Sequence, residues 1–263
     1  MEYLEEQQLN SPPRSDLGIF LTTGEIICTL CGVQKPLVSF TKSKKQAQGI
    51  SSWCRQCKNE HTKSNYNEIR SKVIEIMGGV CVICNEKERR ILQLNHNNGG
   101  GNIDRSVRGF KSLYLQIING EDDINKYTLL CANHNQIHKY IVGRISVPYS
   151  ITLLAKYNKL ICLVPKSQIQ DHSSSSISQW KTRLECVMFL GGKCAVCNIE
   201  DIRVLQLNHL YENGSFERNR HGPATIHKMI LTGVLPKENY NILCANHNIL
   251  YEYEKQANKK RRN

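Results

Sequence analysis

The sequence contains no apolar run that approaches the ~20 residues of a membrane-spanning helix. Residues 1–10 are acidic and polar, so the chain also lacks the charged-then-apolar start of a secretory signal peptide. Acidic residues are in short supply, with 23 Asp and Glu against 35 Lys and Arg, which gives a formal net charge of +12. We therefore expect an intracellular protein, neither secreted nor membrane-bound, whose basic charge suits a nucleic-acid partner.

Cysteine, by contrast, is abundant, with twelve in 263 residues. In a reducing compartment such cysteines are unlikely to form a disulfide framework, and ten of them fall into spaced sets typical of metal ligands. The remaining two, Cys162 and Cys186, are expected to be buried thiols with a packing role.

The sequence is internally duplicated. The segment Gly78–Asn135 recurs as Gly191–Asn248 in the same register, shifted by 113 positions (191 − 78 = 113). Both copies keep G-G-x-C-x-x-C-N, then L-Q-L-N-H, then L-C-A-N-H-N. One chain thus supplies its own comparison, and the residues that both copies keep are those that the unit needs.

Composition and patterning divide the chain into six parts. Apolar spacing predicts helices over 59–77 and 180–190, each ending at a Gly-Gly pair. The apolar stretch 141–164 suits a packed helix or strand pair, and the serine run 173–176 resembles a linker. The expected parts are a flexible leader (1–24), a small zinc module (25–60), repeat one (61–145), a connector (146–172), repeat two (173–258) and a basic tail (259–263).

The cysteines and two histidines form three sets of four. Four thiolates, or three thiolates and an imidazole, suit a closed tetrahedral Zn²⁺ site, and in so small a unit zinc binding supplies folding free energy. We predict up to three structural zinc sites. Their ligands are Cys28, Cys31, Cys54 and Cys57; Cys81, Cys84, Cys131 and His134; and Cys194, Cys197, Cys244 and His247.

Both repeats also keep polar residues that a four-coordinate zinc does not need. Asn95 and His96 end a short apolar stretch that predicts a strand, and Asn135 follows a zinc ligand at the expected first turn of a helix. Clamped around the zinc, the strand end and the helix start could face each other and bind one divalent cation.

These residues and motifs resemble those of the HNH endonucleases, the ββα-metal nucleases of the recombination endonuclease VII kind. The likeness rests on C-x-x-C, on N-H after a strand, and on L-C-x-x-H-N, in both repeats. It implies an α+β protein of small zinc-stabilised modules, with two tandem ββα-metal units of HNH or treble-clef type. The module with Cys28 and Cys54 is similar to the zinc ribbon often joined to such nucleases.

The resemblance implies a metal-dependent DNA endonuclease. It assigns the general base to His96 and the ligands of a catalytic Mg²⁺ or Mn²⁺ to Asn95, Asn135 and His138. His96 would take a proton from water, which attacks phosphorus in line, while the metal stabilises the leaving oxygen. A neutral imidazole with a reference pKa of ~6.5 suits this role at physiological pH.

Two departures from the family pattern matter. Relatives often carry Asp at the position of Asn95, and a neutral amide binds a hard cation less strongly than a carboxylate does. Relatives also commonly have a second C-x-x-C where this chain has Cys131-x-x-His134, so His134 could instead pair with His138 as a catalytic H-x-x-x-H. We prefer His134 as a zinc ligand, because repeat two keeps His247 but has Tyr251 at the position of His138.

Tyr251 predicts that repeat two is a degenerate site, since tyrosine is a poor ligand for a magnesium-type ion at neutral pH. Repeat two nevertheless keeps Asn208, His209 and Asn248. If His138 is merely a surface residue, both repeats would be equally competent. Repeat two would otherwise serve in DNA binding or in forming a pseudo-dimer.

Basic residues offer contacts to the phosphates of double-stranded DNA, although solvated surface charges are an equal alternative. Phe40 and Trp53 could stack on bases, but aromatic residues of zinc ribbons more often belong to the core. We expect a monomer that acts as a pseudo-dimer, or a homodimer. The candidate phosphate contacts are Lys42, Lys44, Lys45, Arg105, Arg108, Arg218 and Arg220, with the basic tail 259–263.

Two other functions fit the same residues. A non-catalytic, zinc-dependent DNA-binding or regulatory protein would use all three modules without cutting. A nuclease of restriction, homing or junction-resolving type would use repeat two to read sequence or branch shape, which no motif in this chain fixes.

Overall fold

The computed structural model describes residues 24–44, 46, 49–99, 101, 106–107, 109–142, 145–157, 172–211 and 214–262. Contacts divide the chain into two units, Met1–Glu68 and Ile69–Asn263. Several sequence predictions concern residues outside the described ones. These are the leader up to residue 23, Lys45, Arg105, Arg108 and Cys162. In the part of the chain that is described, no helix is both long enough and apolar enough to cross a membrane.

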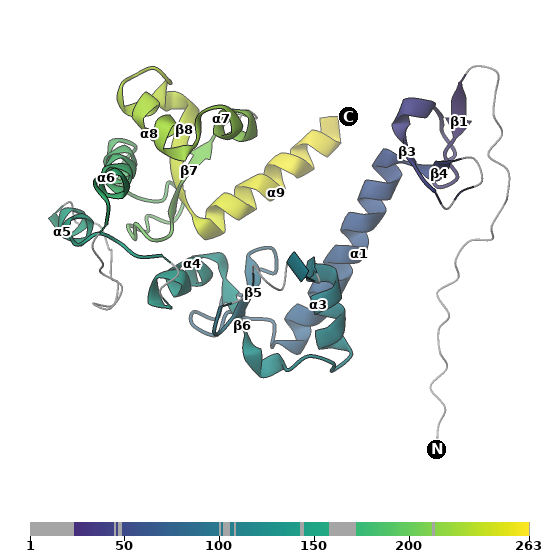
Figure 1. Cartoon of the computed structure of the whole chain (residues 1–263), viewed down its shortest axis with the longest axis horizontal. Coiled ribbons are helices and arrows are strands. Elements are labelled where there is room, and N and C mark those ends of the chain that lie inside the picture. Colours follow the sequence, from purple (N-terminus) through teal and green to yellow (C-terminus); the bar gives the residue numbers. More distant parts are fainter. Residues whose placement is uncertain are drawn as a thin grey trace. The chain divides into compact units, whose positions relative to one another are not determined.

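The first unit is built from two small antiparallel sheets (Figure 1). Strand β1 (Glu25–Ile27) pairs with β2 (Gln34–Pro36), and β3 (Phe40–Lys42) pairs with β4 (Ile50–Cys54). A short 3-10 helix, η1 (Leu37–Ser39), links the two sheets. Phe40 is only 4% exposed and packs with the cysteines, so the core alternative holds and the ring is not available for stacking on bases.

Helix α1 (Arg55–Ile76) covers the segment in which the apolar spacing predicts a helix. Ile69, Val73 and Ile74 are buried, as their shared face requires. The helix ends just before Gly78 and Gly79, whose φ angles of +89° and +72° are in the left-handed region that favours glycine. The expected stop signal is therefore confirmed.

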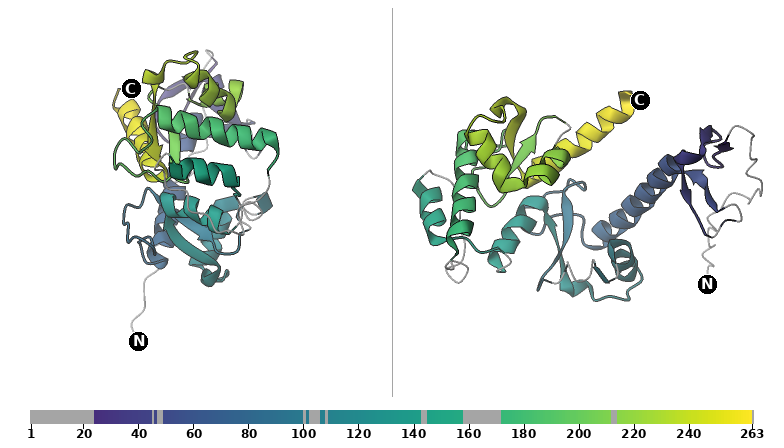
Figure 2. Two further views of the ribbon diagram at one scale, coloured as in Figure 1. Left: turned by 90° about the vertical axis from the view of Figure 1, so that its left-hand side faces the viewer. Right: turned by 45° about the horizontal axis from the view of Figure 1, so that its top comes forward.

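The two repeats fold alike around two-stranded antiparallel sheets. Strand β5 (Leu92–His96) pairs with β6 (Tyr127–Cys131), and β7 (Leu205–His209) pairs with β8 (Tyr240–Cys244). The register is the same in both, since Leu92 faces Cys131 and Leu205 faces Cys244. The second strand of each pair runs directly into a helix, α4 (Ala132–Ile141) or α9 (Ala245–Arg262) (Figure 2).

Between its two strands, each repeat inserts short helices. Repeat one has α3 (Gly109–Ile118) and η2 (Ile124–Lys126). Repeat two has α7 (Gly214–His221), α8 (Pro223–Leu231) and η4 (Lys237–Asn239). These inserts differ more between the repeats than the strands do.

An arginine in each repeat ties the preceding helix to the first strand. Arg70 donates to the carbonyls of Arg89 and Leu92 at 2.8 and 2.5 Å. Its counterpart Arg183 donates to the carbonyls of Ile202 and Leu205 at 2.9 and 2.7 Å. Charge-assisted bonds to carbonyls fix where the strand begins.

The segment before repeat two is helical rather than a linker. Helix α6 (Ser174–Phe189) begins inside the serine run, with Ser173 as its N-cap accepting from the Ser176 N–H. The linker prediction for 173–176 was wrong because serine is also a favoured N-cap residue. Helix α5 (Tyr149–Tyr157) lies beside α6, and its Ala155 belongs to the core of repeat two (Figures 1 and 2). The molecule is thus of mixed α+β class with small antiparallel sheets, as expected.

Candidate metal centres and the polar sites beside them

Three clusters of cysteine and histidine could each hold a metal ion. Within each cluster one ligand atom per residue lies within 4.8 Å of all the others. Four sulfurs, or three sulfurs and one imidazole nitrogen, are the donor sets of structural zinc sites. The clusters are Cys28, Cys31, Cys54 and Cys57; Cys81, Cys84, Cys131 and His134; and Cys194, Cys197, Cys244 and His247.

The repeat clusters have nearly the same geometry. In repeat one, Nδ1 of His134 lies 3.2 Å from the Cys131 sulfur and 3.5 Å from the Cys81 sulfur. In repeat two, Nδ1 of His247 lies 3.2 Å from Cys244 and 3.6 Å from Cys194. The structure thus brings His134 to the thiols.

A left-handed asparagine completes the turn that carries the first two cysteines of each repeat. Asn85 and Asn198 have φ angles of +57° and +59°, and the Asn85 N–H donates to the Cys81 carbonyl at 2.8 Å. Asparagine tolerates this conformation better than most residues do. This turn explains why both repeats keep Asn after C-x-x-C.

Backbone donors favour the thiolate form of the first cysteine in each cluster, whereas burial raises the pKa of Cys84, Cys131, Cys197 and Cys244. Burial raises the pKa of Cys28, but hydrogen bonds from the backbone of Cys54, Cys31 and Leu30 outweigh it and bring the pKa to about 6. At Cys81 and Cys194 burial is likewise outweighed by backbone donors, and each pKa is lowered. A thiolate is the form that binds metal.

The leftover Cys186 is fully buried. Burial raises its pKa to about 11, and the charge of Arg183 offsets this only in part. Such a thiol is inert, in keeping with the packing role expected for it.

In repeat one, Asn95 is the most unusual polar residue. Its side chain is 2% exposed, and within the described ranges neither its Nδ2 nor its Oδ1 has a hydrogen-bond partner. The neighbouring His96 ends β5 and stacks edge-on against Tyr127, with ring centroids 4.9 Å apart. An unpaired buried amide is rare because it costs about 1–3 kcal/mol.

Asn135 lies in the first turn of α4 and faces the sheet. Its Nδ2 donates to Oε1 of Gln93 at 2.5 Å, and in repeat two Asn248 donates to Gln206 at 2.7 Å. The sequence did not lead us to expect this hydrogen bond to the glutamine, although both repeats keep the residue within L-Q-L-N-H. His138 lies one turn after His134 on the same helix.

A glycine packs against each candidate catalytic histidine. A Cβ atom added at Gly101 would lie 2.9 Å from Nδ1 of His96, and one added at Gly214 would lie 2.9 Å from Nδ1 of His209. Contacts this short do not occur for a real Cβ, so the ring would have to move. The signal in the sequence is a glycine five residues after the histidine in both repeats.

In repeat two the histidine has a carboxylate beside it. Nε2 of His209 lies 3.2 Å from Oε2 of Glu217, which is 8% exposed and also accepts from the Tyr240 hydroxyl at 2.7 Å. Burial and this Glu217 contact raise the pKa of Tyr240, so the phenol remains a donor. Sequence reasoning missed Glu217, which lies eight residues beyond the histidine.

The other polar groups of repeat two are also engaged. Nδ2 of Asn208 donates to Oδ1 of Asn241 at 2.9 Å. The Tyr251 hydroxyl donates to the carbonyl of Leu210 at 3.1 Å, and its ring packs against the core. Tyr251 therefore has a structural role at the position that His138 occupies in repeat one.

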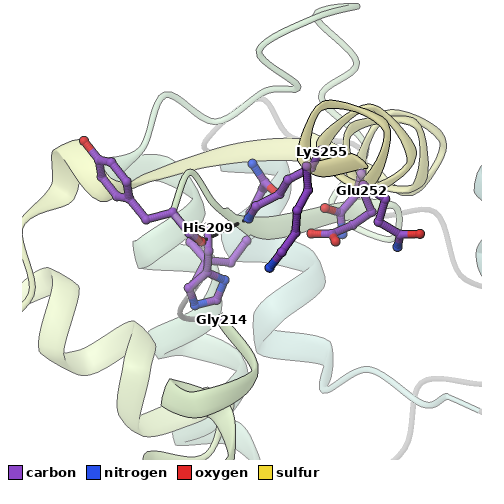
Figure 3. Close-up of a pocket in the computed structure, with 10 residues that line it drawn as sticks. His209, Gly214, Glu252 and Lys255 are labelled. Atoms are coloured by element: carbon purple, nitrogen blue, oxygen red, sulfur yellow. Dashed lines mark hydrogen bonds between the residues drawn. The ribbon is translucent and has the colours of Figure 1, made fainter. Parts of the chain in front are cut away.

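A pocket of about 460 Å³ lies over His209 and Asn208. One wall comes from α9, and Figure 3 shows Lys255 extending from that helix toward His209, with Gly214 beside the ring. Nζ of Lys255 donates to the carbonyl of Tyr211 at 3.1 Å. The lining residues are Leu207, Asn208, His209, Tyr211 and Gly214, with Asn248, Glu252, Lys255, Gln256 and Lys259 from α9.

Of the candidate phosphate contacts, Lys42, Lys44 and Arg220 are exposed. Arg218 lies in α7, and its side chain is outside the described part of the chain. The pocket adds Lys255 and Lys259, which the sequence interpretation did not single out. The sequence could have indicated these lysines, because helical periodicity places residues 248, 252, 255, 256 and 259 on one face of a helix.

Comparisons with protein-family models, with curated proteins and with solved structures find no match for this chain. The functional argument therefore rests on the chemistry of the residues described above.

Proposed function

We propose that this chain is a zinc-stabilised, metal-dependent DNA endonuclease of HNH type, in which repeat one cuts and repeat two holds the DNA. The three cysteine clusters would each bind a structural Zn²⁺. The unit around β1 to β4 would be a zinc ribbon, and its exposed Lys42 and Lys44 would add contacts to the DNA backbone.

One observation carries this proposal. Asn95 is buried with neither end of its amide bonded among the described residues, and it immediately precedes His96. Burying such a group has a cost of about 1–3 kcal/mol that packing alone does not explain. A ligand that engages the amide would remove that cost.

The oxygen and nitrogen donors of repeat one would serve as ligands of a hard divalent cation such as Mg²⁺ or Mn²⁺. Asn95, Asn135 and His138 would hold it, and the bond from Asn135 Nδ2 to Gln93 leaves Oδ1 of that amide for the ion. When bound, the cation supplies stabilisation of the charge on the leaving oxygen. His96 would take a proton from the water that attacks phosphorus, while Gly101 and Tyr127 hold its ring in place.

Repeat two is better suited to binding. Its histidine lies against Glu217, and Tyr251 is turned to a backbone carbonyl. Lys255 and Lys259 line its pocket, whereas repeat one has Val142 and Ser146 at the corresponding positions. Two cations on one helix face suit a phosphodiester backbone.

A non-catalytic DNA-binding protein is the competing function, and one observation favours it. The bonds from Asn135 to Gln93 and from Asn248 to Gln206 give a purely structural reason for keeping these residues in both repeats. On that reading the histidines at the strand ends only pack against Tyr127 and Tyr240.

Cutting of supercoiled plasmid tests the proposal. Zinc-loaded protein and its His96→Ala and His209→Ala variants are incubated with Mg²⁺ or Mn²⁺, and nicked and linear products are separated. We expect mainly nicked circles from the parent, because a single active site cuts only one strand. Loss of the general base in His96→Ala should lower the rate about 100-fold or more, while His209→Ala should retain it.

Two results would overturn this assignment. Cutting by no form with either metal, together with retained DNA binding, favours the non-catalytic function. Equal dependence on both histidines would mean that repeat two also cuts.

A further inference from the structure

The helices α4 and α9 each begin with the sequence A-N-H-N, and their first turns meet within the second unit. There Asn133 and Asn246 exchange hydrogen bonds. The Asn133 N–H donates to Oδ1 of Asn246 at 2.9 Å, and the Asn246 N–H donates to Oδ1 of Asn133 at 3.0 Å. The two positions correspond in the duplication (246 − 133 = 113), so the contact is reciprocal about a local two-fold axis.

Each of these bonds supplies a helix cap from the other repeat. The first N–H groups of a helix have no partner within it and are usually capped by a preceding side chain. Cys131 is the N-cap of α4 but makes no side-chain cap bond, and its sulfur belongs to the metal cluster. Oδ1 of Asn246 serves the N–H of Asn133 instead.

These caps hold the turns that carry the metal ligands. The capped N–H of Asn133 lies between Cys131 and His134, and the capped N–H of Asn246 lies between Cys244 and His247. Each asparagine therefore fixes the ligand-bearing turn of the opposite cluster.

We propose that the two repeat clusters form one coupled metal centre, in which each asparagine positions a zinc ligand of the other repeat. This rests on the proposed zinc binding and is independent of DNA cleavage. Removing a group that orients metal ligands typically lowers metal affinity 10–100-fold. Loss of zinc from one repeat should also release the asparagine that supports the other.

Site-resolved alkylation tests the coupling. The full-length zinc-loaded protein and its Asn246→Ala variant are challenged with a chelator and iodoacetamide, and modification of each cysteine is followed by peptide mass spectrometry. Although the substitution lies in repeat two, we expect Cys81, Cys84 and Cys131 to react about 10-fold faster or more. Asn133→Ala should expose Cys194, Cys197 and Cys244 in the same way.

The chain offers internal controls. The cluster of Cys28 and Cys54 should react at the parent rate in both variants, and Asn258→Ala, an exposed asparagine on α9, should change nothing. Asn246→Asp keeps an oxygen that can cap α4. It should therefore keep the alkylation rates of the repeat-one cysteines close to those of the parent.

Faster alkylation confined to the repeat that carries the substitution would overturn the coupling. Unchanged alkylation rates at all cysteines would overturn it as well. A parent protein that elemental analysis finds free of zinc would overturn it together with the zinc proposal, whatever the result on plasmid.

Discussion

At the scale of single residues, the polar groups that both repeats keep divide into two kinds. Nδ2 of Asn135 is bonded to Oε1 of Gln93 across the gap between strand and helix, so that end of the amide is part of the scaffold and only Oδ1 remains for the proposed cation. The side chain of Asn95, in contrast, is buried and has no hydrogen-bond partner among the described residues. Gly101 lies so close to the ring of His96 that a side chain there would displace it. The unbonded buried amide beside the packed imidazole is the feature that the proposed cation site would explain.

Replacing Gly101 by alanine tests the placement of His96. The new Cβ would lie 2.9 Å from the ring nitrogen, so the imidazole must shift. We expect plasmid cutting to fall about 100-fold or more, because a shift of this size misplaces a catalytic group, while zinc content stays at the parent level. Cleavage assays with metal analysis measure both.

Gly214→Ala is the matched control for this change, because it makes the same contact with His209 in repeat two. If repeat one is the cutting site, this variant should cut plasmid as the parent does. Undiminished cutting by Gly101→Ala would remove His96 from the catalytic role.

At the scale of elements, the two helices that follow the second strands differ in length and in charge. Helix α4 spans 10 residues and α9 spans 18. Only the longer helix carries Lys255 and Lys259 along the face that lines the pocket. The two helices thus share a first turn that carries the cluster histidine, but their sequences diverge one turn later.

We expect the α9 lysines to contribute to DNA affinity through phosphate contacts. Substituting Lys255→Gln and Lys259→Gln together should weaken binding of a duplex and reduce the salt dependence of log Kd by roughly 2, about one for each lost contact. Fluorescence anisotropy over a series of salt concentrations, with the His96→Ala protein to prevent cutting, measures this slope.

Lys181→Gln provides the comparison, since Lys181 is exposed on α6 and paired with Glu185 at 3.8 Å. It should leave the slope unchanged. A double variant of α9 with the parent slope would rule out the pocket as a phosphate site.

At the scale of the whole molecule, the cysteine and histidine clusters lie within small cores. Each sheet of the repeats has only two strands, and cluster cysteines are themselves among the buried core residues. Such cores supply limited hydrophobic stabilisation, and the proposed zinc ions would supply the remainder.

Metal removal should therefore unfold the protein. We expect three zinc ions per chain by elemental analysis, and a large loss of helical and near-ultraviolet circular dichroism on treatment with a strong chelator. Readdition of Zn²⁺ under reducing conditions should restore the signal, whereas Mg²⁺ should not. A chain that keeps its spectrum without metal would contradict this view of its stability.

The sequence by itself determined the duplication, the helix that ends just before Gly78, and the grouping of cysteines with His134 and His247. These features could be predicted because short spacings and local turn chemistry control them. The same local logic failed at Ser173, where a serine run that resembles a linker caps a helix.

Only the tertiary structure decided which distant groups meet. No periodicity places Glu217 beside His209, or Asn133 against a residue 113 positions away. Such contacts depend on how inserts fold back and how the two repeats pack, and they are made by residues whose local patterns look ordinary. The sequence fixes the spacing of the candidate metal ligands. Tertiary packing decides that Glu217 lies beside His209 and that Asn133 and Asn246 bond to each other.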